Sequence, residues 1–405
     1  MSELTYLEKL LDGVKVEWQT LGKVLKRTKG TKITAGQMKA LHKDNAPLKI
    51  FAGGKTVAFV DFKDIPEKDI NREPSIIVKS RGIIEFEYYD KPFSHKNEMW
   101  SYHSNNDAIS IKYIYYFLKI NEGYFQKIGG KMQMPQIATP DTDKFEVPIP
   151  CPDNPEKSLA IQSEIVRILD KFTALTAELT AELSMRKKQY NYYRDQLLSF
   201  DESSVEWKTL LEACDYVDYR GKTPKKTQSG IFLVTAKNIR MGYIDYHASQ
   251  EFISEEDYAI VMRRGLPKKG DVLITTEAPC GFVAQVNREN IALAQRVIKY
   301  RSKNTQLSNS FLKHYLLGSQ FQDKLMQAAT GSTVKGIKGS RLHQLKIPIP
   351  SKVEQDRIVA ILDKFDTLTN SITEGLPREI ELRQKQYEYY RDLLFSFPKP
   401  ETVSN

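Results

Sequence analysis

Two tripeptides resemble the end of a phosphate-binding loop, and they are the first residues in the chain whose spacing suggests catalysis. They are Gly54-Lys55-Thr56 and Gly221-Lys222-Thr223. A nucleotide-binding loop also needs a glycine five positions before its second glycine, so that the backbone can wrap the phosphates. Lys49 and Tyr216 occupy those positions. The sequence therefore gives no support for a nucleotide site.

Other catalytic and metal-binding patterns are also incomplete. Glu206-Trp207-Lys208 has the Glu-x-Lys spacing of some nucleases, but it belongs to a repeated motif whose first copy carries Gln19 in place of the lysine. The chain has no Asp/Asn-Pro-Pro-aromatic tetrapeptide of the amino-methyltransferases. Its three cysteines are far apart and its six histidines lack ligand spacing. This pattern predicts a reducing compartment, without a disulfide framework or a metal site.

Basic and polar side chains in predicted turns beside strands are the remaining candidates. In the first half they are Lys55, Thr56, Lys79, Ser80, Arg81, Lys91, Ser94, His95, Lys96 and Asn97. In the second half they are Arg220, Lys222, Lys225, Lys226, Lys237, Asn238, Arg240, Thr275, Thr276, Glu277, Gln295, Arg296, Ser332, Thr333, Lys335, Lys338 and Arg341. Lysine and arginine neutralise phosphates regardless of sequence, whereas Arg, Asn, Gln, Glu and Thr can read base edges. Any one of these residues also fits a plain solvated surface, but as a set they predict DNA contacts.

The net charge of +9 is concentrated in two segments of similar length. Residues 1–150 hold 23 Lys+Arg and 19 Asp+Glu, a balance of +4, and residues 201–350 hold 22 and 15, a balance of +7. Residues 151–200 hold 7 of each sign, and residues 351–405 hold 8 and 10. This distribution indicates that the two basic segments bind a polyanion.

One stretch occurs twice and predicts two long helices. The first copy covers residues 165–172 and 188–200, and the second covers residues 358–365 and 385–397. Apolar residues recur every three or four positions in both copies, which is typical of one helical stripe. A narrow stripe on so long a helix needs a partner, and the other copy is the natural one.

The two helices differ in continuity. No Gly or Pro occurs from Glu156 to Phe200, which predicts an unbroken helix of about 60 Å. In the second copy Gly375 and Pro377 should kink or interrupt the helix.

Each helix follows a globular segment with the same edges. Residues 16–21 and 205–210 open the two segments, and residues 147–150 and 347–350 close them. Proline at alternate positions of the closing motif forces an extended exit. The interiors barely agree in sequence. Constant edges with different middles predict one scaffold that presents two different surfaces.

Both interiors predict mixed α/β domains, since 405 residues are too many for one core. Strands are expected at residues 56–60, 75–78 and 83–88, and again at 231–234, 271–275 and 296–300. Helices are expected at residues 111–119 and 310–328. The pairing of the strands cannot be inferred from these patterns.

The repeated motifs carry a resemblance to a known family. They are the two Lys-Gln-Tyr-x-Tyr-Tyr-Arg-Asp ends, the tandem Thr-Ala-Glu-Leu unit at residues 176–183, the opening at residues 6–13, and the runs at residues 220–226, 235–239 and 331–338. Over essentially its whole length the chain resembles the specificity (S) subunit of type I restriction-modification enzymes, most closely the type IC group.

The resemblance implies an α+β fold, in which two mixed α/β target-recognition domains are separated by two long antiparallel, coiled-coil-like helices in a pseudo-two-fold repeat. It implies double-stranded DNA, two modification (M) subunits and up to two restriction (R) subunits as partners. The S subunit would have no active site and bind no cofactor. S-adenosylmethionine would sit on the M subunits, which methylate adenine at N6, and ATP and Mg²⁺ on the R subunits.

The resemblance and the motifs together define expected boundaries. The first recognition domain is expected at residues 1–150, the central helix at 151–200, the second domain at 201–350, the C-terminal helix at 351–397 and a tail at 398–405. Each domain would read one half of an asymmetric target, and the helices would set the gap and dock the M subunits. Tyr190, Tyr193, Tyr387 and Tyr390 are expected near those docking surfaces.

The expected location is the cytoplasm of a bacterium or archaeon, on the nucleoid through DNA. No apolar run approaches the length of a membrane span, and the first residues lack the pattern of a secretory signal.

Two alternative functions stay open at this point. One is a stand-alone DNA-binding regulator without enzyme partners, although such proteins are more often symmetric dimers that read palindromes. The other is a helical scaffold without a nucleic-acid role, which the charge distribution disfavours.

Overall fold

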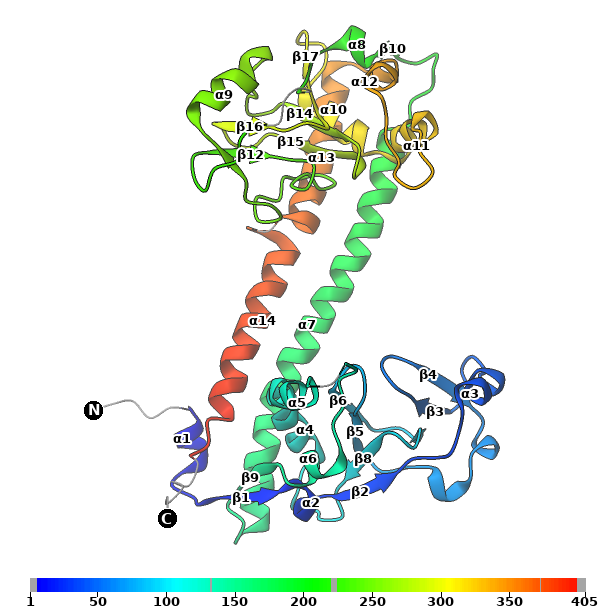
Figure 1. Cartoon of the computed structure of the whole chain (residues 1–405), viewed down its shortest axis with the longest axis vertical. Helices are drawn as coiled ribbons and strands as arrows, with labels where there is room; N and C mark the ends of the chain where they lie inside the picture. Colours follow the sequence, from blue (N-terminus) through cyan, green and yellow to red (C-terminus); the bar gives the residue numbers. More distant parts are fainter. Residues whose placement is uncertain (1–5, 132, 220–223, 372, 399–405) are drawn as a thin grey trace, which may run out of the picture. The chain divides into compact units, whose positions relative to one another are not determined.

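The computed structural model describes residues 6–131, 133–219, 224–371 and 373–398. It divides into two compact units, Met1–Ala177 with Leu382–Asn405 (unit 1) and Glu178–Glu381 (unit 2). Helices α7 (Pro155–Leu197) and α14 (Gly375–Leu394) each contribute to both units (Figure 1). The boundaries expected at residues 150, 200 and 350 separate globular segments from helices. The two compact units are divided within the long helices, at Ala177/Glu178 and Glu381/Leu382, so each unit contains a globular segment and the helix parts that pack against it.

Three sheets form the β-structure described in unit 1. The largest has the order β2 (Lys26–Lys29), β8 (Trp100–His103), β5 (Ser75–Lys79), β6 (Glu85–Tyr89), with antiparallel neighbours throughout. In the second, β3 (Leu48–Phe51) lies between antiparallel β4 (Val57–Val60) and parallel β7 (Phe93–His95). The third pairs β1 (Val16–Thr20) with β9 (Glu146–Pro150). The two repeated edge motifs of the first half therefore meet as one antiparallel ribbon.

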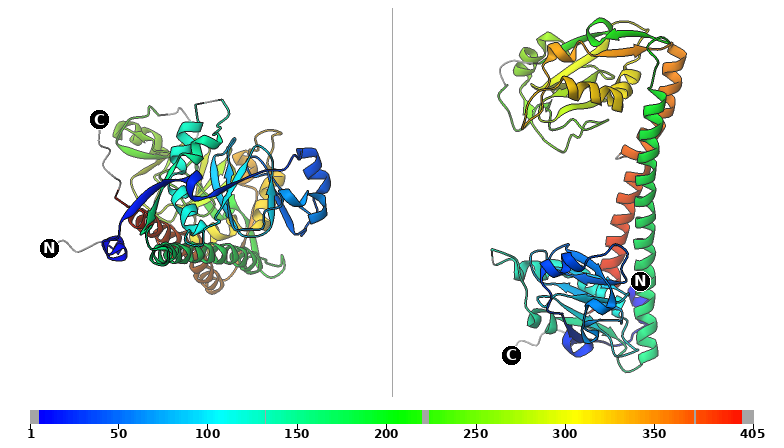
Figure 2. Two further views of the ribbon diagram at one scale, coloured as in Figure 1. Left: turned by 90° about the horizontal axis from the view of Figure 1, so that it is seen from below. Right: turned by 90° about the vertical axis from the view of Figure 1, so that its right-hand side faces the viewer.

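The helices of unit 1 join the four-stranded sheet to the long helices. The shorter helices are α1 (Tyr6–Leu11), α2 (Leu21–Val24), α3 (Ala35–Leu41), the 3₁₀ turns η1 (Phe62–Asp64) and η2 (Glu67–Asp69), α4 (Ile111–Ile120), α5 (Glu122–Gly129) and α6 (Thr139–Asp143). One apolar cluster contains Val78 of the sheet, Ile114 of α4, Ile165 of α7 and Leu394 of α14. Within this unit α7 and α14 run antiparallel, with Phe172 stacked on Tyr390 at 5.4 Å (Figures 1 and 2).

Unit 2 repeats this topology strand for strand. Its largest sheet has the order β11 (Cys214–Asp218), β17 (Val297–Ser302), β14 (Val272–Thr276), β15 (Cys280–Gln285), again antiparallel. In the second sheet β12 (Ile231–Val234) lies between antiparallel β13 (Phe252–Ile253) and parallel β16 (Ile291–Leu293). The edge ribbon pairs β10 (Glu206–Thr209) with β18 (Lys346–Ile349). The predicted fold class and internal repeat are confirmed, and the repeat extends through interiors whose sequences barely agree.

The helices of unit 2 follow the same plan. They are α8 (Leu210–Ala213), α9 (Glu255–Val261), the 3₁₀ turn η3 (Met262–Arg264), α10 (Asn309–Leu317), α11 (Ser319–Ala328), α12 (Gly339–Leu342) and α13 (Lys352–Asn370). Helix α10 packs between the sheet and α13, as α4 packs between the sheet and α7 in unit 1. In this unit α7 packs against α13 through Tyr190, whose ring stacks on Phe365 at 6.0 Å.

The predicted interruption of the second long helix is confirmed. Helix α13 ends at Asn370 and α14 begins at Gly375. Gly375 has φ +79°, and a Cβ atom there would lie 2.4 Å from the carbonyl oxygen of Thr367. Both the backbone conformation and the close approach therefore require glycine at this position. The predicted helix at residues 310–328 is likewise divided into α10 and α11, because Gly318 ends α10 with an extended backbone.

A buried glutamine ties each globular segment to its long helix. Gln162 of α7 is fully buried, accepts the N–H of Ser110 at 2.8 Å and donates to the carbonyl of Ala108 at 3.0 Å. Gln355 of α13 is also fully buried and makes the same two bonds. It accepts the N–H of Ser308 at 2.8 Å and donates to the carbonyl of Gln306 at 2.6 Å.

A carboxylate in the repeated motif adds a second tie. The Tyr116 hydroxyl donates to Asp170 at 2.5 Å, and at the repeat-related position Nε2 of His314 lies 2.7 Å from Asp363. Each serine that caps α4 or α10 is thus fixed by a glutamine, and a side chain six residues further along each helix is fixed by an aspartate.

His95, a predicted DNA contact, lies in the interior of unit 1 with no exposed surface. Its Nδ1–H donates to the carbonyl of Lys96 at 3.2 Å, so its neutral Nε2 accepts from the Ser101 hydroxyl at 3.1 Å. Burial lowers the pKa of His95 to about 4, although the hydrogen bond to Lys96 opposes this shift. His95 is therefore a structural residue, neutral at physiological pH.

The glutamine ties predict separable effects on the two units. Gln162→Leu leaves the Ser110 N–H and the Ala108 carbonyl unpaired, which should lower the unfolding free energy of unit 1 by roughly 2 kcal/mol or more. Hydrogen exchange should then accelerate in α4 and remain unchanged in α10. Gln355→Leu is the matched control and should give the reverse pattern. Equal acceleration in both helices for either variant would contradict local ties.

The buried His95 predicts acid sensitivity of unit 1. A histidine whose pKa is lower in the folded state contributes its full stability above the unfolded pKa of about 6.5, and this contribution is lost as pH falls. Unfolding monitored by Trp18 and Trp100 in a Trp207→Phe background should show a loss of about 2 kcal/mol from pH 7 to pH 5. Adding His95→Gln should remove most of that slope; identical slopes would contradict the assignment.

Candidate nucleic-acid interface

Each four-stranded sheet has a polar rim where its third strand ends. Rim 1 follows β5 and precedes β8, and rim 2 follows β14 and precedes β17. A loop closes each rim through an isolated bridge, Arg81 with Gln136 in unit 1 and Glu277 with Gly336 in unit 2. We define rim 1 as Ser80, Arg81, Asn97, Glu98 and Gln136, and rim 2 as Thr276, Glu277, Gln295, Arg296 and Gly336.

Rim 1 is held by polar contacts between its side chains. The Arg81 guanidinium donates to Gln136 Oε1 at 3.1 Å, and Lys96 pairs with Glu98 at 2.7 Å. Burial raises the pKa of Glu98, but the hydrogen bond from Lys96 and the charges of Lys96 and Arg81 together bring it below its ordinary value. Glu98 is therefore ionised at physiological pH and is surrounded by cations.

Rim 2 lines a hollow of about 590 Å³ that also includes Lys338 and Val334. In it Arg296 Nε lies 3.4 Å from Glu277 Oε2, and both side chains are about half exposed. The N–H of Thr276 donates to the carbonyl of Arg296 at 2.8 Å, which fixes the backbone at this point. The hollow presents two cations, Arg296 and Lys338, one carboxylate and neutral polar groups to a ligand.

A larger hollow of about 820 Å³ adjoins rim 1. It reaches rim 1 at Asn97, and we call it the basic hollow. Its lining includes four cationic side chains, Arg27, Lys29, Lys32 and Lys68, and two carboxylates, Asp64 and Asp69. Its shape depends on Gly30, because a Cβ atom there would lie 2.3 Å from the carbonyl oxygen of Lys96. Sequence reasoning missed these four cations, since they lie in β2, the following loop and a 3₁₀ turn, outside the runs chosen as turns beside strands.

Several of the predicted DNA contacts meet at the two rims. Arg81 and Lys96 lie at rim 1, and Thr276, Glu277, Gln295, Arg296 and Lys338 line the hollow of rim 2. Others are exposed in separate loops of their units: Lys55, Thr56, Lys91, Lys225, Lys226, Lys237, Ser332, Thr333 and Lys335. Arg341 is exposed in helix α12, where its guanidinium donates to the carbonyl of Ala328 at 3.2 Å. Arg240 is half-buried and lies 3.7 Å from Asp245. Arg220 and Lys222 lie outside the described residues.

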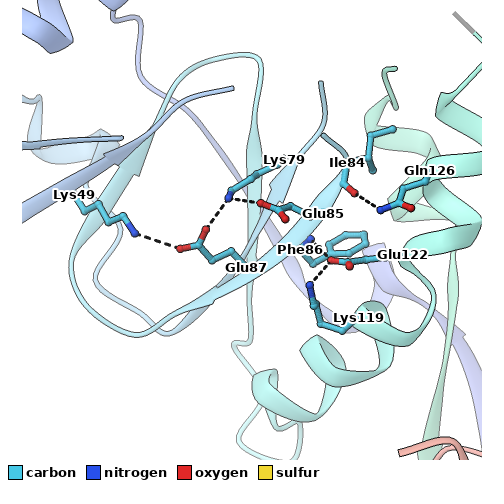
Figure 3. Close-up of polar contacts among 9 residues, drawn as sticks. All are labelled: Lys49, Lys79, Ile84, Glu85, Phe86, Glu87, Lys119, Glu122 and Gln126. Carbon is cyan, nitrogen blue, oxygen red and sulfur yellow. Dashed lines mark hydrogen bonds and ion pairs between the residues drawn. The ribbon is translucent and has the colours of Figure 1, made fainter. Parts of the chain in front are cut away.

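Lys79 and Asn238 are correctly located beside strands but are turned inward. Lys79 is buried and pairs with Glu85 at 2.5 Å and Glu87 at 2.9 Å (Figure 3). Burial alone would lower the pKa of Lys79, but the two carboxylates raise it, so it stays charged within the protein. Asn238 is fully buried, and its side-chain amide donates to the carbonyl of Asp245 at 2.9 Å.

Two further candidates are buried hydroxyl residues. Thr275 has no exposed surface, and its hydroxyl oxygen accepts the N–H of Phe282 at 2.9 Å. Ser94 is likewise fully buried in β7. Like His95, both residues have no exposed surface, so their side chains do not reach a DNA bound at the surface of their unit.

The predicted docking tyrosines divide into two groups. Tyr190 is buried against Phe365, and burial raises its pKa well above the ordinary value. Tyr387 is half-buried. Tyr193 and Tyr390 are 45% and 40% exposed. Sequence reasoning missed the most exposed members of the motif, Tyr192 at 62% and Tyr389 at 64%, which the repeat alignment itself placed at equivalent positions.

Neither a metal-binding cluster nor a membrane-spanning helix is found among the described residues. No group of three or more His, Cys, Asp or Glu side chains is placed to hold a metal ion in the described part of the chain. Among the described helices, none is long and apolar enough to cross a membrane.

Comparison with known proteins gives a consistent result. The family model described as the type I restriction modification DNA specificity domain matches residues 15–185 and 207–382. The chain is 44% identical to the specificity subunit of the Escherichia coli type I restriction enzyme EcoR124I/EcoR124II over the whole of both chains. It is 36% identical to the EcoprrI specificity subunit of Escherichia coli, covering 92% of this chain and 93% of that one.

Solved structures support the fold. A type I restriction-modification S subunit from M. genitalium aligns with a TM-score of 0.61 at 17% identity, covering 96% of this chain and 98% of that one. A chain from a study of type I R-M complex assembly aligns with a TM-score of 0.55 at 14% identity, covering 94% and 97%. Since a matching domain model covers most of each half and full-length relatives exceed 30% identity, the chain belongs to the family of type I restriction-modification DNA specificity subunits.

Proposed function

We propose that this chain gives a type I restriction-modification enzyme its DNA specificity, with each unit reading one half of an asymmetric, bipartite target. The observation that carries the proposal is the pair of rims. Two domains with the same strand order present different side chains at the same place. A protein that reads two unrelated half-sites needs this arrangement, whereas a palindrome would need two equal rims.

DNA binding divides between the rims and the basic hollow of unit 1. Lys29, Lys32 and Lys68 are exposed, and their ammonium groups suit phosphates, which carry no base information. The rims combine Arg, Glu, Asn and Gln, the side chains that pair with base edges in the major groove. The rims therefore provide specificity, and the hollow provides affinity.

The long helices set the distance between the half-sites and dock the M subunits. The segments 151–200 and 351–405 carry no positive excess, which fits protein contacts better than DNA contacts. The exposed rings of Tyr192, Tyr193, Tyr389 and Tyr390 give those helices aromatic surface of the kind enriched at protein interfaces. We assign docking to these four side chains and leave Tyr190 to the packing of unit 2.

In the assembled enzyme the S subunit would contribute no chemistry. Two M subunits would bind S-adenosylmethionine and methylate adenine at N6, and up to two R subunits would use ATP and Mg²⁺. The complex would act in the cytoplasm, on the nucleoid. The rims would hold the DNA so that one adenine in each half-site reaches an M subunit.

Methylome sequencing of a host expressing this chain with its M subunit tests the proposal. The expected motif is interrupted and asymmetric, with methyladenine on both strands. Inserting a third Thr-Ala-Glu-Leu unit after Leu183 should lengthen the unspecified spacer by one or two base pairs, because four helical residues add about 6 Å. Both half-sites should stay unchanged.

Three outcomes would contradict parts of this proposal. A DNA-bound, assembled complex that methylates nothing would favour a regulator over a methyltransferase subunit. A palindromic motif would contradict the two different rims. An insertion variant with altered half-sites and the original spacer would contradict the role of the helices.

The basic hollow generates a prediction about affinity. Lys29→Gln with Lys32→Gln should weaken binding to all duplexes alike and reduce the slope of log K against log salt by about 2, because each lost phosphate contact lowers it by roughly 0.9. The methylated motif should not change. Lys171→Gln, which removes one charge from the exposed surface of α7, is the control and should leave the slope unaltered. A changed motif in the double variant would mean that these lysines read bases.

A further inference from the structure

The register of the two large sheets identifies equivalent positions in the rims. Val78 pairs with Trp100 in unit 1, and Ile274 pairs with Ile298 in unit 2. The N–H of Ile137 donates to the Ser80 carbonyl at 3.0 Å. At the corresponding place the N–H of Ile337 donates to Thr276 at 2.9 Å.

Counting from these anchors gives two matched positions. Arg81 and Glu277 follow the third strand of each sheet and bridge to the closing loop. On the neighbouring strand, Glu98 lies two residues before Trp100, and Arg296 lies two residues before Ile298. The acceptors correspond although the donors differ: the Ser80 hydroxyl donates to the carbonyl of Glu98 at 2.6 Å, and the backbone N–H of Thr276 donates to the carbonyl of Arg296 at 2.8 Å.

The charges at the two matched positions are reversed between the units. In unit 1 the third-strand position carries Arg81 and the neighbouring strand carries Glu98; in unit 2 they carry Glu277 and Arg296. The matched positions of each rim therefore hold one guanidinium and one carboxylate, in opposite orders along the same scaffold. In rim 2 the two groups pair directly, whereas in rim 1 Arg81 also donates to Gln136 and Glu98 pairs with Lys96. Neutral residues flank both pairs, Asn97 in rim 1 and Gln295 in rim 2.

The backbone of Arg296 adds an independent observation. Its φ of +69° lies in the left-handed region, which disfavours an arginine by roughly 1–2 kcal/mol relative to glycine. Its side chain is about half exposed, so packing does not explain why an arginine stands there. Strain of this kind at an exposed charged residue points to a role for the side chain outside the fold.

A guanidinium beside a carboxylate matches the major-groove edge of a G·C pair. Arginine donates two hydrogen bonds to O6 and N7 of guanine, and a carboxylate accepts from N4 of cytosine. We propose that Arg81 with Glu98, and Arg296 with Glu277, each read one G·C base pair, and that the reversed order makes the two domains read it in opposite orientations. This inference rests on the proposed function and names the chemistry of its reading site.

An apolar side chain flanks each pair. Met134 is 60% exposed and Val334 is 52% exposed, and each lies three residues before the isoleucine that anchors its closing loop. Against DNA these side chains would exclude water from the neighbouring pair, and exclusion of water strengthens hydrogen bonds to charged groups.

The test exchanges the two charges within one rim. Glu277→Arg with Arg296→Glu keeps the net charge, the ion pair and a non-glycine residue at φ +69°, and gives rim 2 the order found in rim 1. Methylome sequencing of the full complex should show one G·C pair of one half-site replaced by C·G, selected roughly tenfold or more over the original. The other half-site and the spacer should not change.

The controls separate this inference from the proposed function. Glu354→Arg with Arg357→Glu, which reverses an exposed ion pair of α13, should leave the motif intact. A wild-type complex without a bipartite motif would refute the proposed function. A bipartite wild-type motif that the rim exchange leaves unchanged would overturn this inference alone.

A second variant keeps the inference testable if the charge exchange abolishes all methylation. Glu277→Gln removes the carboxylate charge at nearly constant shape, and it should relax one C·G position while the rest of the motif is kept. Wild-type selectivity at every position in Glu277→Gln would overturn the inference, because the carboxylate would then contribute nothing to base choice.

Discussion

The buried glutamine at the start of each long helix is the constraint on which both units depend. Gln162 and Gln355 bond to the two backbone groups that flank the beginning of α4 and α10, and neither side chain has exposed surface. Each short helix covers the large sheet of its unit, and each sheet ends in a rim. The orientation of the rim is therefore set from the long helix outward. An unpaired amide at this buried place would be costly, which makes the geometry difficult to alter gradually.

The repeat in the sequence understates the repeat in the structure. The edge motifs and the helix motifs are visibly duplicated, but β3, β4 and β7 have no recognisable counterparts in the sequence of β12, β13 and β16. They nonetheless pair with the same neighbours in the same directions. Burial explains the difference. Interior strands need apolar residues of suitable volume rather than particular ones, whereas the glutamine and the edge prolines act through specific backbone geometry.

Local sequence signals were strong enough to predict the helices and strands, but they did not predict which side chains would contact one another. The helix expected from Glu156 to Phe200 is α7, Pro155–Leu197, and the strand expected at residues 231–234 is β12. Strand pairing could not be inferred, because it depends on contacts between residues far apart in sequence.

The same limit explains the wrong predictions at the candidate interface. Nothing near Lys79 in the sequence shows that Glu85 and Glu87 will both face it, and nothing near His95 shows that Ser101 will cover it. Arg81, Glu277 and Arg296 were identified because turns beside strands usually stay exposed.

Stability and specificity are thus located in different parts of each unit. The rim pairs are about half exposed or lie at the surface, where substitutions usually change the unfolding free energy by less than about 0.5 kcal/mol. The glutamine ties and the inward lysine are buried, where loss of one partner has several times that effect. New target sequences can therefore arise by changes at a rim without loss of the fold. This separation requires that the residues that read DNA contribute little to the stability of the sheet. Lys79 is buried with its two carboxylates, whereas Arg81, two residues later, is exposed and contacts only the closing loop among the bonds described.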